Sequence, residues 1–359
     1  MLTKAGEKTY GKDIFFSGLL KKVVPGLSFF CLSLVSVKQR RSYPLRIEQT
    51  VRSAEEKTAS QVKKQAKKAR PEGEKRKRGR PKGSRNKDKA EVVLNPELIR
   101  IHKMIHAVLE TIQGFVKIRY LMLDGHFGNH SALHMVMQCG LHLISKLRAD
   151  AALFFPYDGP SPKRGPRPRL GERLNFHKIP DHYLKTTTLE DGMETRIYQS
   201  QLLHREFSIP LNVVILVKTN LVTKSWSHVI LFSSDLDLSY DKLIDYYRLR
   251  FQIEFNFRDA KQFWGLEDFV NVTQTAVTNA ANLSLFMVVV FQVLKCKYYF
   301  DDPDFSVIDL KAHYRGYRYM VETIKILPQK PDDNLVAQLF LNVAALGRIH
   351  HAKTSTFSG

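Results

Sequence analysis

The chain has 359 residues, is 43% hydrophobic, and carries a formal net charge of +21. This length suits one large domain or two ordinary ones, and the apolar share is enough to bury a core. The charge favours a polyanionic partner, with nucleic acid ahead of a membrane surface. Three widely separated cysteines, none in a metal-ligand spacing, argue against a disulfide framework and favour a reducing cytoplasm, where we expect the protein to associate with the nucleoid.

We expect no membrane partner. The first residues are polar and give no signal peptide. The most apolar run, from Leu283 to Leu294, is too short to span a bilayer and contains Gln292. This run predicts a buried helix instead.

The first part of the chain predicts two strands, over residues 27–37 and 43–50, joined by the basic turn KQRRS. The composition then changes. Between Lys57 and Lys89 there are ten Lys and five Arg against three acids, a net charge of +12. With so few apolar residues, this stretch predicts a disordered or weakly helical arm.

A motif within this arm, Arg78-Gly79-Arg80-Pro81-Lys82-Gly83, resembles an AT-hook. In that motif, extended Arg side chains lie in the minor groove of A·T-rich DNA. A charged linker or a targeting-like basic run would have the same composition, and phosphate contacts alone would provide affinity. We expect Arg78, Arg80 and Lys82 to contact DNA.

After the arm, the pattern predicts a helix over 97–113, a strand over 115–123, a helix from about 129 and a strand over 141–148. This order indicates an α/β fold. Asp124 follows the first of these strands, and ligand sites of open α/β sheets collect at such strand ends. Asp-Gly is also a common turn, which leaves a purely structural role open.

The rest of the chain changes from strands to helices. A loop rich in Pro, Gly and Arg (156–173) precedes predicted strands over 195–204, 211–218 and 227–233, which together suggest a β-rich insertion. Predicted helices follow over 240–262, 275–297, 308–326 and 333–345. We divide the chain into N-terminal core strands (1–55), a basic arm (56–92), a core with Asp124 (93–155), a β-rich insertion (156–238), core helices (239–300) and a C-terminal helical region (301–359).

A polar stripe runs along the predicted helix 240–262. At 100° per residue, Tyr247, Arg250, Glu254 and Lys261 fall within an arc of about 60°, with apolar residues on both sides. An ion-pair network that holds helices together would give the same pattern. Because such networks cost desolvation and stabilise poorly, the stripe favours a functional site.

The spacing Tyr247-x2-Arg250-x3-Glu254-x6-Lys261 resembles the C-terminal signature of DDE transposases from bacterial insertion sequences of the IS-four type. The resemblance implies an RNase H-like mixed sheet with flanking helices. It implies that Glu254 is an acidic ligand of two divalent metal ions, Mg²⁺ or Mn²⁺, and that Tyr247, Arg250 and Lys261 position DNA phosphates. Two hard cations bound by carboxylates suit in-line attack on a phosphodiester.

The segment Asp124-Gly125-His126-Phe127-Gly128 is similar to, but more closely spaced than, the family's segment around its second catalytic Asp. The resemblance implies that Asp124 is a metal ligand. In this family the first Asp precedes a segment similar to the one from Lys4 to Gly11. The sequence begins at Met1, so we expect an N-terminally truncated chain that catalyses weakly.

The resemblance implies a transposase that binds transposon ends and target DNA, cleaves strands and transfers them. Many such enzymes act as dimers across paired ends, so a homodimer is expected. One alternative is a non-catalytic DNA-binding remnant of a transposase. Another is a structural nucleic-acid-binding protein in which the stripe is only an ion-pair network.

Overall fold

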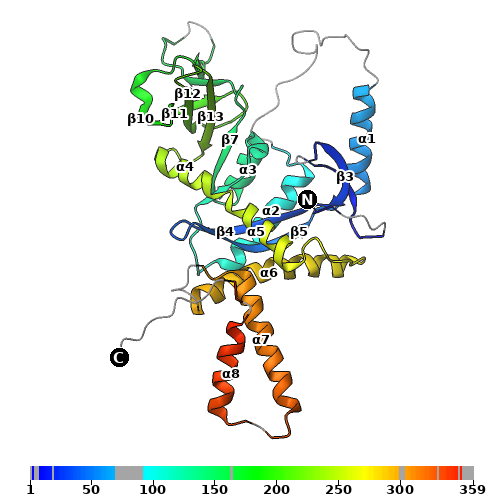
Figure 1. Ribbon diagram of the computed structural model, residues 1–359. Helices are drawn as coiled ribbons and strands as arrows, with labels where there is room; N and C mark the ends of the chain where they lie inside the picture. Colours follow the sequence, from blue (N-terminus) through cyan, green and yellow to red (C-terminus); the bar gives the residue numbers. More distant parts are fainter. Residues whose placement is uncertain are drawn as a thin grey trace. The chain divides into compact units, whose positions relative to one another are not determined.

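The computed structural model describes residues 2–3, 8–17, 20–68, 92–161, 165–298, 304–329, 331–346 and 348–349 (Figure 1). The chain divides into two compact units. Unit 1 contains residues 1–31, 47–51 and 254–359, and unit 2 contains residues 32–46 and 52–253.

Unit 2 is built on an eight-stranded mixed sheet. Seven strands lie in the order β6-β7-β13-β12-β11-β8-β9, and β10 pairs with β11. The pair β6–β7 is parallel and the other pairs are antiparallel. The strands are β6 (Tyr120–Met122), β7 (His142–Leu147), β8 (Leu153–Pro156), β9 (Leu170–Arg173), β10 (Leu184–Glu190), β11 (Met193–His204), β12 (Leu211–Asn220) and β13 (Trp226–Ser233).

The predicted strands over 195–204, 211–218 and 227–233 are confirmed as β11, β12 and β13. These strands continue the sheet that contains β6 and β7. The strand predicted over 115–123 is wrong in length, because only Tyr120–Met122 is strand. Since β7 begins at His142, opposite Tyr120, the earlier residues have no strand to pair with there, and Phe115 is exposed.

The core of unit 2 forms where the central strands are apolar on both faces, as in strands covered on both sides. Ile144, Val214 and Leu231 from neighbouring strands form one buried cluster with Leu243 and Ile244 of α4 (Tyr240–Leu249). Burial of each such side chain contributes about 1.5–3 kcal/mol. This packing fixes α4 against β7, β12 and β13.

Three further helices belong to unit 2. They are α1 (Ala54–Lys68), α2 (Pro96–Ile112) and α3 (His130–Gln138), and short 3₁₀ turns η1 and η2 cover Gly125–Phe127 and Asp181–Tyr183. Asn95 caps α2 by accepting a 2.8 Å hydrogen bond from the Leu98 N–H, and Pro96 occupies the first turn. Helix α1 covers the first part of the predicted basic arm, whose weak helical tendency the structure therefore confirms there.

Unit 1 combines a small antiparallel sheet with helices. The sheet order is β1-β3-β2, from β1 (Leu2–Thr3), β2 (Asp13–Ser17) and β3 (Lys22–Leu27). The helices are α5 (Gln252–Trp264), α6 (Gln274–Tyr298), α7 (Val307–Ile326) and α8 (Asp333–Ala345), which confirms the last three helices predicted from the sequence. A hairpin of β4 (Phe29–Ser36) and β5 (Arg41–Gln49), also predicted, contributes residues to both units.

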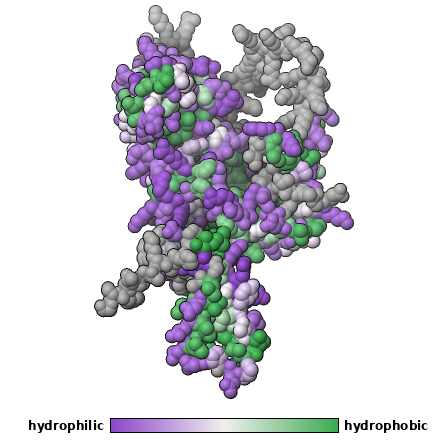
Figure 2. All heavy atoms as spheres, viewed as in Figure 1, coloured by the Kyte–Doolittle hydropathy of each residue, from purple (hydrophilic) through white to green (hydrophobic). Residues whose placement is uncertain are grey.

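The helical end of unit 1 exposes apolar residues. Helices α7 and α8 pack together, and Figure 2 shows apolar side chains on their surface. Exposed apolar residues of these helices are Ile326, Leu335 and Leu341. Within the described residues, α6 is the one helix long and apolar enough to cross a membrane. Core helices pass the same test of length and composition, so this is weak support for a span.

The mixed sheet, the flanking helices and the helical C-terminal part confirm the α/β fold class expected from the sequence.

The turn after β6 depends on a glycine. A Cβ added to Gly128 would overlap the carbonyl oxygen of Lys146 in β7, whereas one added to Gly125 would meet the Lys146 Cε at an acceptable 3.4 Å. We therefore expect Gly128→Ala to lower the thermal unfolding midpoint by at least about 2 °C, because the turn must move away from the strand. Gly125→Ala is the matched control and should change the midpoint less; equal midpoints for the two variants would contradict the close approach.

Candidate active site

Asp124 lies at the carboxyl end of β6, and the local structure fixes it there. The Leu123 N–H donates to the Ile144 carbonyl at 3.0 Å, which continues the parallel pairing of β6 with β7. The carbonyl of Asp124 accepts a 2.9 Å hydrogen bond from the buried hydroxyl of Ser145. These two hydrogen bonds hold the backbone at Leu123 and Asp124 in place, while the Asp124 side chain is exposed.

The carboxylate of Asp124 caps the 3₁₀ turn η1. Its Oδ1 atom accepts a 2.5 Å hydrogen bond from the His126 N–H. Within the part of the chain that the structure describes, no hydrogen bond to Oδ2 is found. This leaves an exposed carboxylate oxygen at a strand end, which is the kind of oxygen ligand that Mg²⁺ and Mn²⁺ prefer.

Two of the predicted phosphate-positioning residues lie near Asp124 in unit 2. Burial raises the pKa of Tyr247, the cation of Arg250 opposes this shift, and the charge of Asp124 adds to it. The guanidinium of Arg250 lies 5.7 Å from the centre of the Tyr247 ring. The structure therefore brings Asp124, Tyr247 and Arg250 into one electrostatic neighbourhood at the end of β6.

Lys146 adds a cation that the sequence analysis missed. Its side chain lies against the Asp124 turn, since its Cε would be 3.4 Å from a Cβ on Gly125. The signal was present in β7, where Lys146 is the one exposed position among buried neighbours. An exposed lysine in a mostly buried strand, packed against the turn that follows Asp124, is a candidate phosphate contact.

The prediction of one continuous helix over 240–262 is wrong. Helix α4 ends at Leu249, and α5 begins at Gln252. The N–H groups of Arg250, Phe251 and Ile253 donate to carbonyls three residues earlier rather than four. These tighter bonds break the regular winding, so the stripe of four residues does not lie on a single helix.

Helix α5 carries the other two residues of the predicted stripe. Glu254 is exposed in the first turn of α5, and Lys261 lies in its last turn, so a seven-residue interval places both on one face. The Lys261 Nζ pairs with Glu267 Oε1 at 2.7 Å. The structure places Glu254 and Lys261 in unit 1 and Asp124, Tyr247 and Arg250 in unit 2.

The predicted AT-hook contacts Arg78, Arg80 and Lys82 lie outside the described residues.

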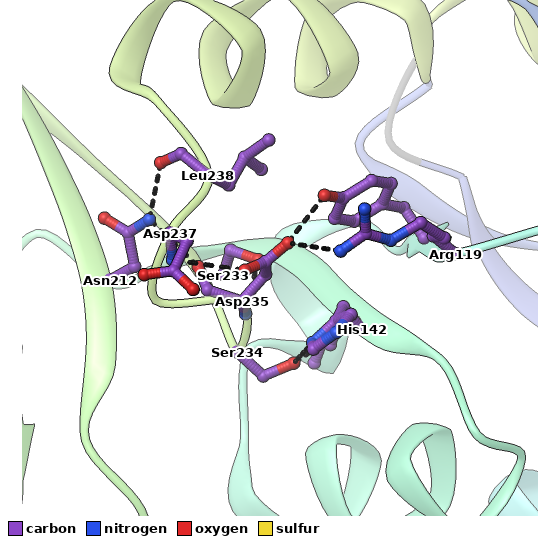
Figure 3. A network of polar contacts seen from close by, with 10 residues as sticks. Arg119, His142, Asn212, Ser233, Ser234, Asp235, Asp237 and Leu238 are labelled. Atoms are coloured by element: carbon purple, nitrogen blue, oxygen red, sulfur yellow. Dashed lines mark hydrogen bonds and ion pairs between the residues drawn. The ribbon is translucent and has the colours of Figure 1, made fainter.

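A buried polar network supports this site from the start of β6 (Figure 3). The Tyr120 hydroxyl donates to Asp235 Oδ2 at 2.6 Å, and Arg119 lies 3.5 Å from the same oxygen. Asn212 donates from one amide nitrogen to the carbonyls of Asp235 and Leu238, at 2.9 and 2.7 Å. Since Leu238 lies two residues before the start of α4, the network links the strand that leads to Asp124 with the helix that carries Tyr247.

The network also sets the ionisation of its members. Burial alone would raise the pKa of Asp235, but hydrogen bonds from Tyr120 and from the Asp237 N–H outweigh it and lower that pKa. Burial, together with the hydrogen bond to Asp235, raises the pKa of Tyr120 to about 12. Asp235 is therefore a buried anion stabilised by donors, with a structural role distinct from that of Asp124.

The mixed sheet with flanking helices, and the exposed carboxylate of Asp124 at the end of β6, place the protein in the α/β class. The family model of the DDE superfamily endonucleases matches residues 1–206, more than half of the chain. The chain belongs to this family. Among curated proteins, the search finds no match.

The family match includes Asp124 and Lys146 and ends before Tyr247. Family membership supports transposase or nuclease chemistry, a DNA substrate and divalent metals as a class. The parts played by Tyr247, Arg250, Glu254 and Lys261 rest on their spacing and on the geometry described above.

Titration of Tyr120 should make stability depend on pH in the alkaline range. The pKa of Tyr120 is 10.0 ordinarily and about 12 in the folded protein. Because the folded state holds this proton more tightly, the contribution is fully present below pH 10 and is lost as the pH rises from about 10 to about 12. We expect the difference in urea midpoint between wild type and Tyr120→Phe to shrink across that range.

Ser234→Ala is the control for this experiment, because the Ser234 hydroxyl accepts from the Leu143 N–H at 3.1 Å and does not titrate. The difference in urea midpoint between Ser234→Ala and the wild type should stay constant over the same pH range. A Tyr120→Phe curve parallel to the wild-type curve from pH 9 to 12 would contradict the assignment.

Proposed function

We propose that this protein is a DNA transposase of the DDE endonuclease family, which binds transposon-end DNA, cleaves it and transfers the strand to target DNA. The observation that carries the proposal is the exposed carboxylate of Asp124 at the end of β6, whose charge acts on Tyr247, while the Arg250 guanidinium lies 5.7 Å from the centre of the Tyr247 ring. An acid beside a phenol and a guanidinium suits a phosphodiester: the acid attracts cations, and the two donors bind phosphate oxygens.

Asp124 and Glu254 are the proposed metal ligands, in a two-metal site for Mg²⁺ or Mn²⁺. The Asp124 carboxylate fits this role because it is exposed and its Oδ1 alone is used in the turn. Glu254 is exposed and lies one helical turn after Arg250 in the sequence. When bound, the cations supply Lewis-acid stabilisation of the charge that develops on the phosphate.

Arg250 and Tyr247 orient the phosphate. A guanidinium holds two phosphate oxygens through parallel donors, which fixes the scissile group for in-line attack. Its position over the Tyr247 ring limits its rotamers, so less freedom is lost when the phosphate binds. The Tyr247 phenol is protonated at neutral pH and can therefore donate a hydrogen bond to a phosphate oxygen.

The remaining cations are proposed to bind DNA phosphates. Lys146 contributes from β7 and Lys261 from α5, while Arg78, Arg80 and Lys82 extend the contact along the basic arm. The net charge of +21 supports such a polyanionic partner. We propose that two copies act together on paired DNA ends and that the protein associates with the nucleoid.

Strand nicking of supercoiled DNA in Mn²⁺ tests the proposal. We expect nicking by the wild type and a loss of at least about 100-fold in Asp124→Asn and Glu254→Gln, because each removes a charge that holds the cations. Arg250→Gln should reduce the rate by about 10- to 1,000-fold, as for the loss of one phosphate-stabilising donor. Thermal unfolding of each variant checks that the fold is intact.

Asp241→Asn is the matched control, since it removes an exposed carboxylate from the first turn of α4. It should nick like the wild type. Binding of DNA without nicking by the wild type would contradict the proposal and favour a non-catalytic DNA-binding protein. Nicking that survives both Asp124→Asn and Glu254→Gln would do so as well.

A further inference from the structure

A second cluster of metal-ligating side chains lies in unit 2, in residues that the proposed chemistry does not use. His102 and His106 are one turn apart on α2, and Cys139 is the C-cap of α3. One ligand atom from each lies within 4.8 Å of the other two. The sequence hides this cluster, because Cys139 is far from both histidines along the chain.

The distance between the two imidazoles matches that of two ligands on one ion. The Nε2 atoms of His102 and His106 are 3.2 Å apart, and their ring centres are 4.5 Å apart. Two nitrogens bound at 2.0–2.1 Å to a tetrahedral Zn²⁺ stand about 3.4 Å apart, and a thiolate stands about 3.6 Å from each. A small rotation of the Cys139 side chain would complete the geometry.

The backbones that carry these ligands are held in place. The Cys139 N–H donates to the Val136 carbonyl at 3.1 Å, and the next residue, Gly140, takes a left-handed conformation with φ +71° that ends α3. Helix α2 is anchored through buried Ile101 and Ile105, which flank the histidines in sequence. The ligands therefore project from two rigid elements that already pack together.

We propose that His102, His106 and Cys139 form a zinc site. Two imidazoles and a thiolate select a borderline or soft ion such as Zn²⁺ over Mg²⁺, which separates this site from the carboxylate of Asp124. Three protein ligands leave a fourth position for water. His106 is exposed, so the ion reaches the site from solvent.

Binding uses a lone pair from each Nε2 and from the Cys139 sulfur, whose proton leaves to solvent. Burial and the neighbouring His106 lower the pKa of His102, which keeps that imidazole neutral and available. Burial raises the pKa of Cys139 to about 11, so the free site holds a thiol and the ion must displace its proton.

The bound ion would join α2 to α3. Helix α3 begins at His130, after the turn that Asp124 opens, and its buried Leu133 and Val136 pack in the core. A link at the C-terminal end of α3 would therefore stabilise the segment that follows Asp124. Stability should therefore rise as the ion binds, while the fourth position stays open to water.

Titration of the full-length, reduced protein with Co²⁺ tests the site, with excess Mg²⁺ present to occupy carboxylates. We expect one Co²⁺ per chain, a thiolate-to-metal charge-transfer band in the near ultraviolet, and displacement by one equivalent of Zn²⁺. Cys139→Ser should abolish the band. His106→Ala, at an exposed position that the fold does not need, should weaken binding by more than about 10-fold, since loss of even an indirect partner costs that much.

Two controls separate this site from general histidine or thiol binding. His134→Ala disrupts the pair His130 and His134, which has the same spacing but ring centres 6.5 Å apart. Cys296→Ser removes an exposed thiol from unit 1. Both should leave the band and the affinity unchanged. Absence of a charge-transfer band in the wild type, or its persistence in Cys139→Ser, would overturn the proposal.

Discussion

The parallel pairing of β6 with β7 is the constraint on which the candidate active site depends. Strand β6 has three residues, and its register sets Tyr120 opposite His142 and Met122 opposite Ile144. A shift by one residue would turn each side chain to the other face of the sheet and remove Asp124 from the strand end. Gly128 protects this register, because the turn after Asp124 packs directly on the backbone of β7.

Because β6 is so short, it needs support beyond its backbone hydrogen bonds with β7. The network around Asp235 provides this support. Tyr120 is both a residue of β6 and a donor to Asp235, while Asn212 connects Asp235 with Leu238, two residues before α4. The same buried anion thus fixes the strand with Asp124 and the helix with Tyr247. Tyr120 lies four residues before Asp124. The geometry of the site is therefore set by groups that touch no substrate.

The sequence predicted those parts of the structure that local pattern determines. Asp124 was predicted to follow a strand, and the structure places it after β6; the strands β11 to β13 and the helices α6 to α8 follow from their periodicity. The break between α4 and α5 was missed, since a change from i−4 to i−3 hydrogen bonding at Arg250 leaves no mark in the apolar pattern. The shortness of β6 was missed because strand length depends on where the partner strand begins.

Contacts between residues that are far apart along the chain could not be predicted from the sequence either. Lys146 and Gly128 are separated by a whole helix, and their packing became visible only in the fold. The same holds for Cys139 beside His102 and His106, which share no motif spacing. Asp235 follows β13 and two serines, a pattern that predicts an ordinary turn. Only its burial in the fold shows that it is the centre of a polar network.

The central proposal is that the Asp124 carboxylate binds the catalytic cation, and metal-directed cleavage of the polypeptide tests it most directly. Fe²⁺ in place of Mg²⁺, with ascorbate and peroxide and with Zn²⁺ already added, cuts a chain next to its ligands. We expect a cut near Asp124 that excess Mg²⁺ suppresses and that is lost in Asp124→Asn. No cut near Asp124 in the wild type, or a cut there that persists in Asp124→Asn, would contradict the proposal.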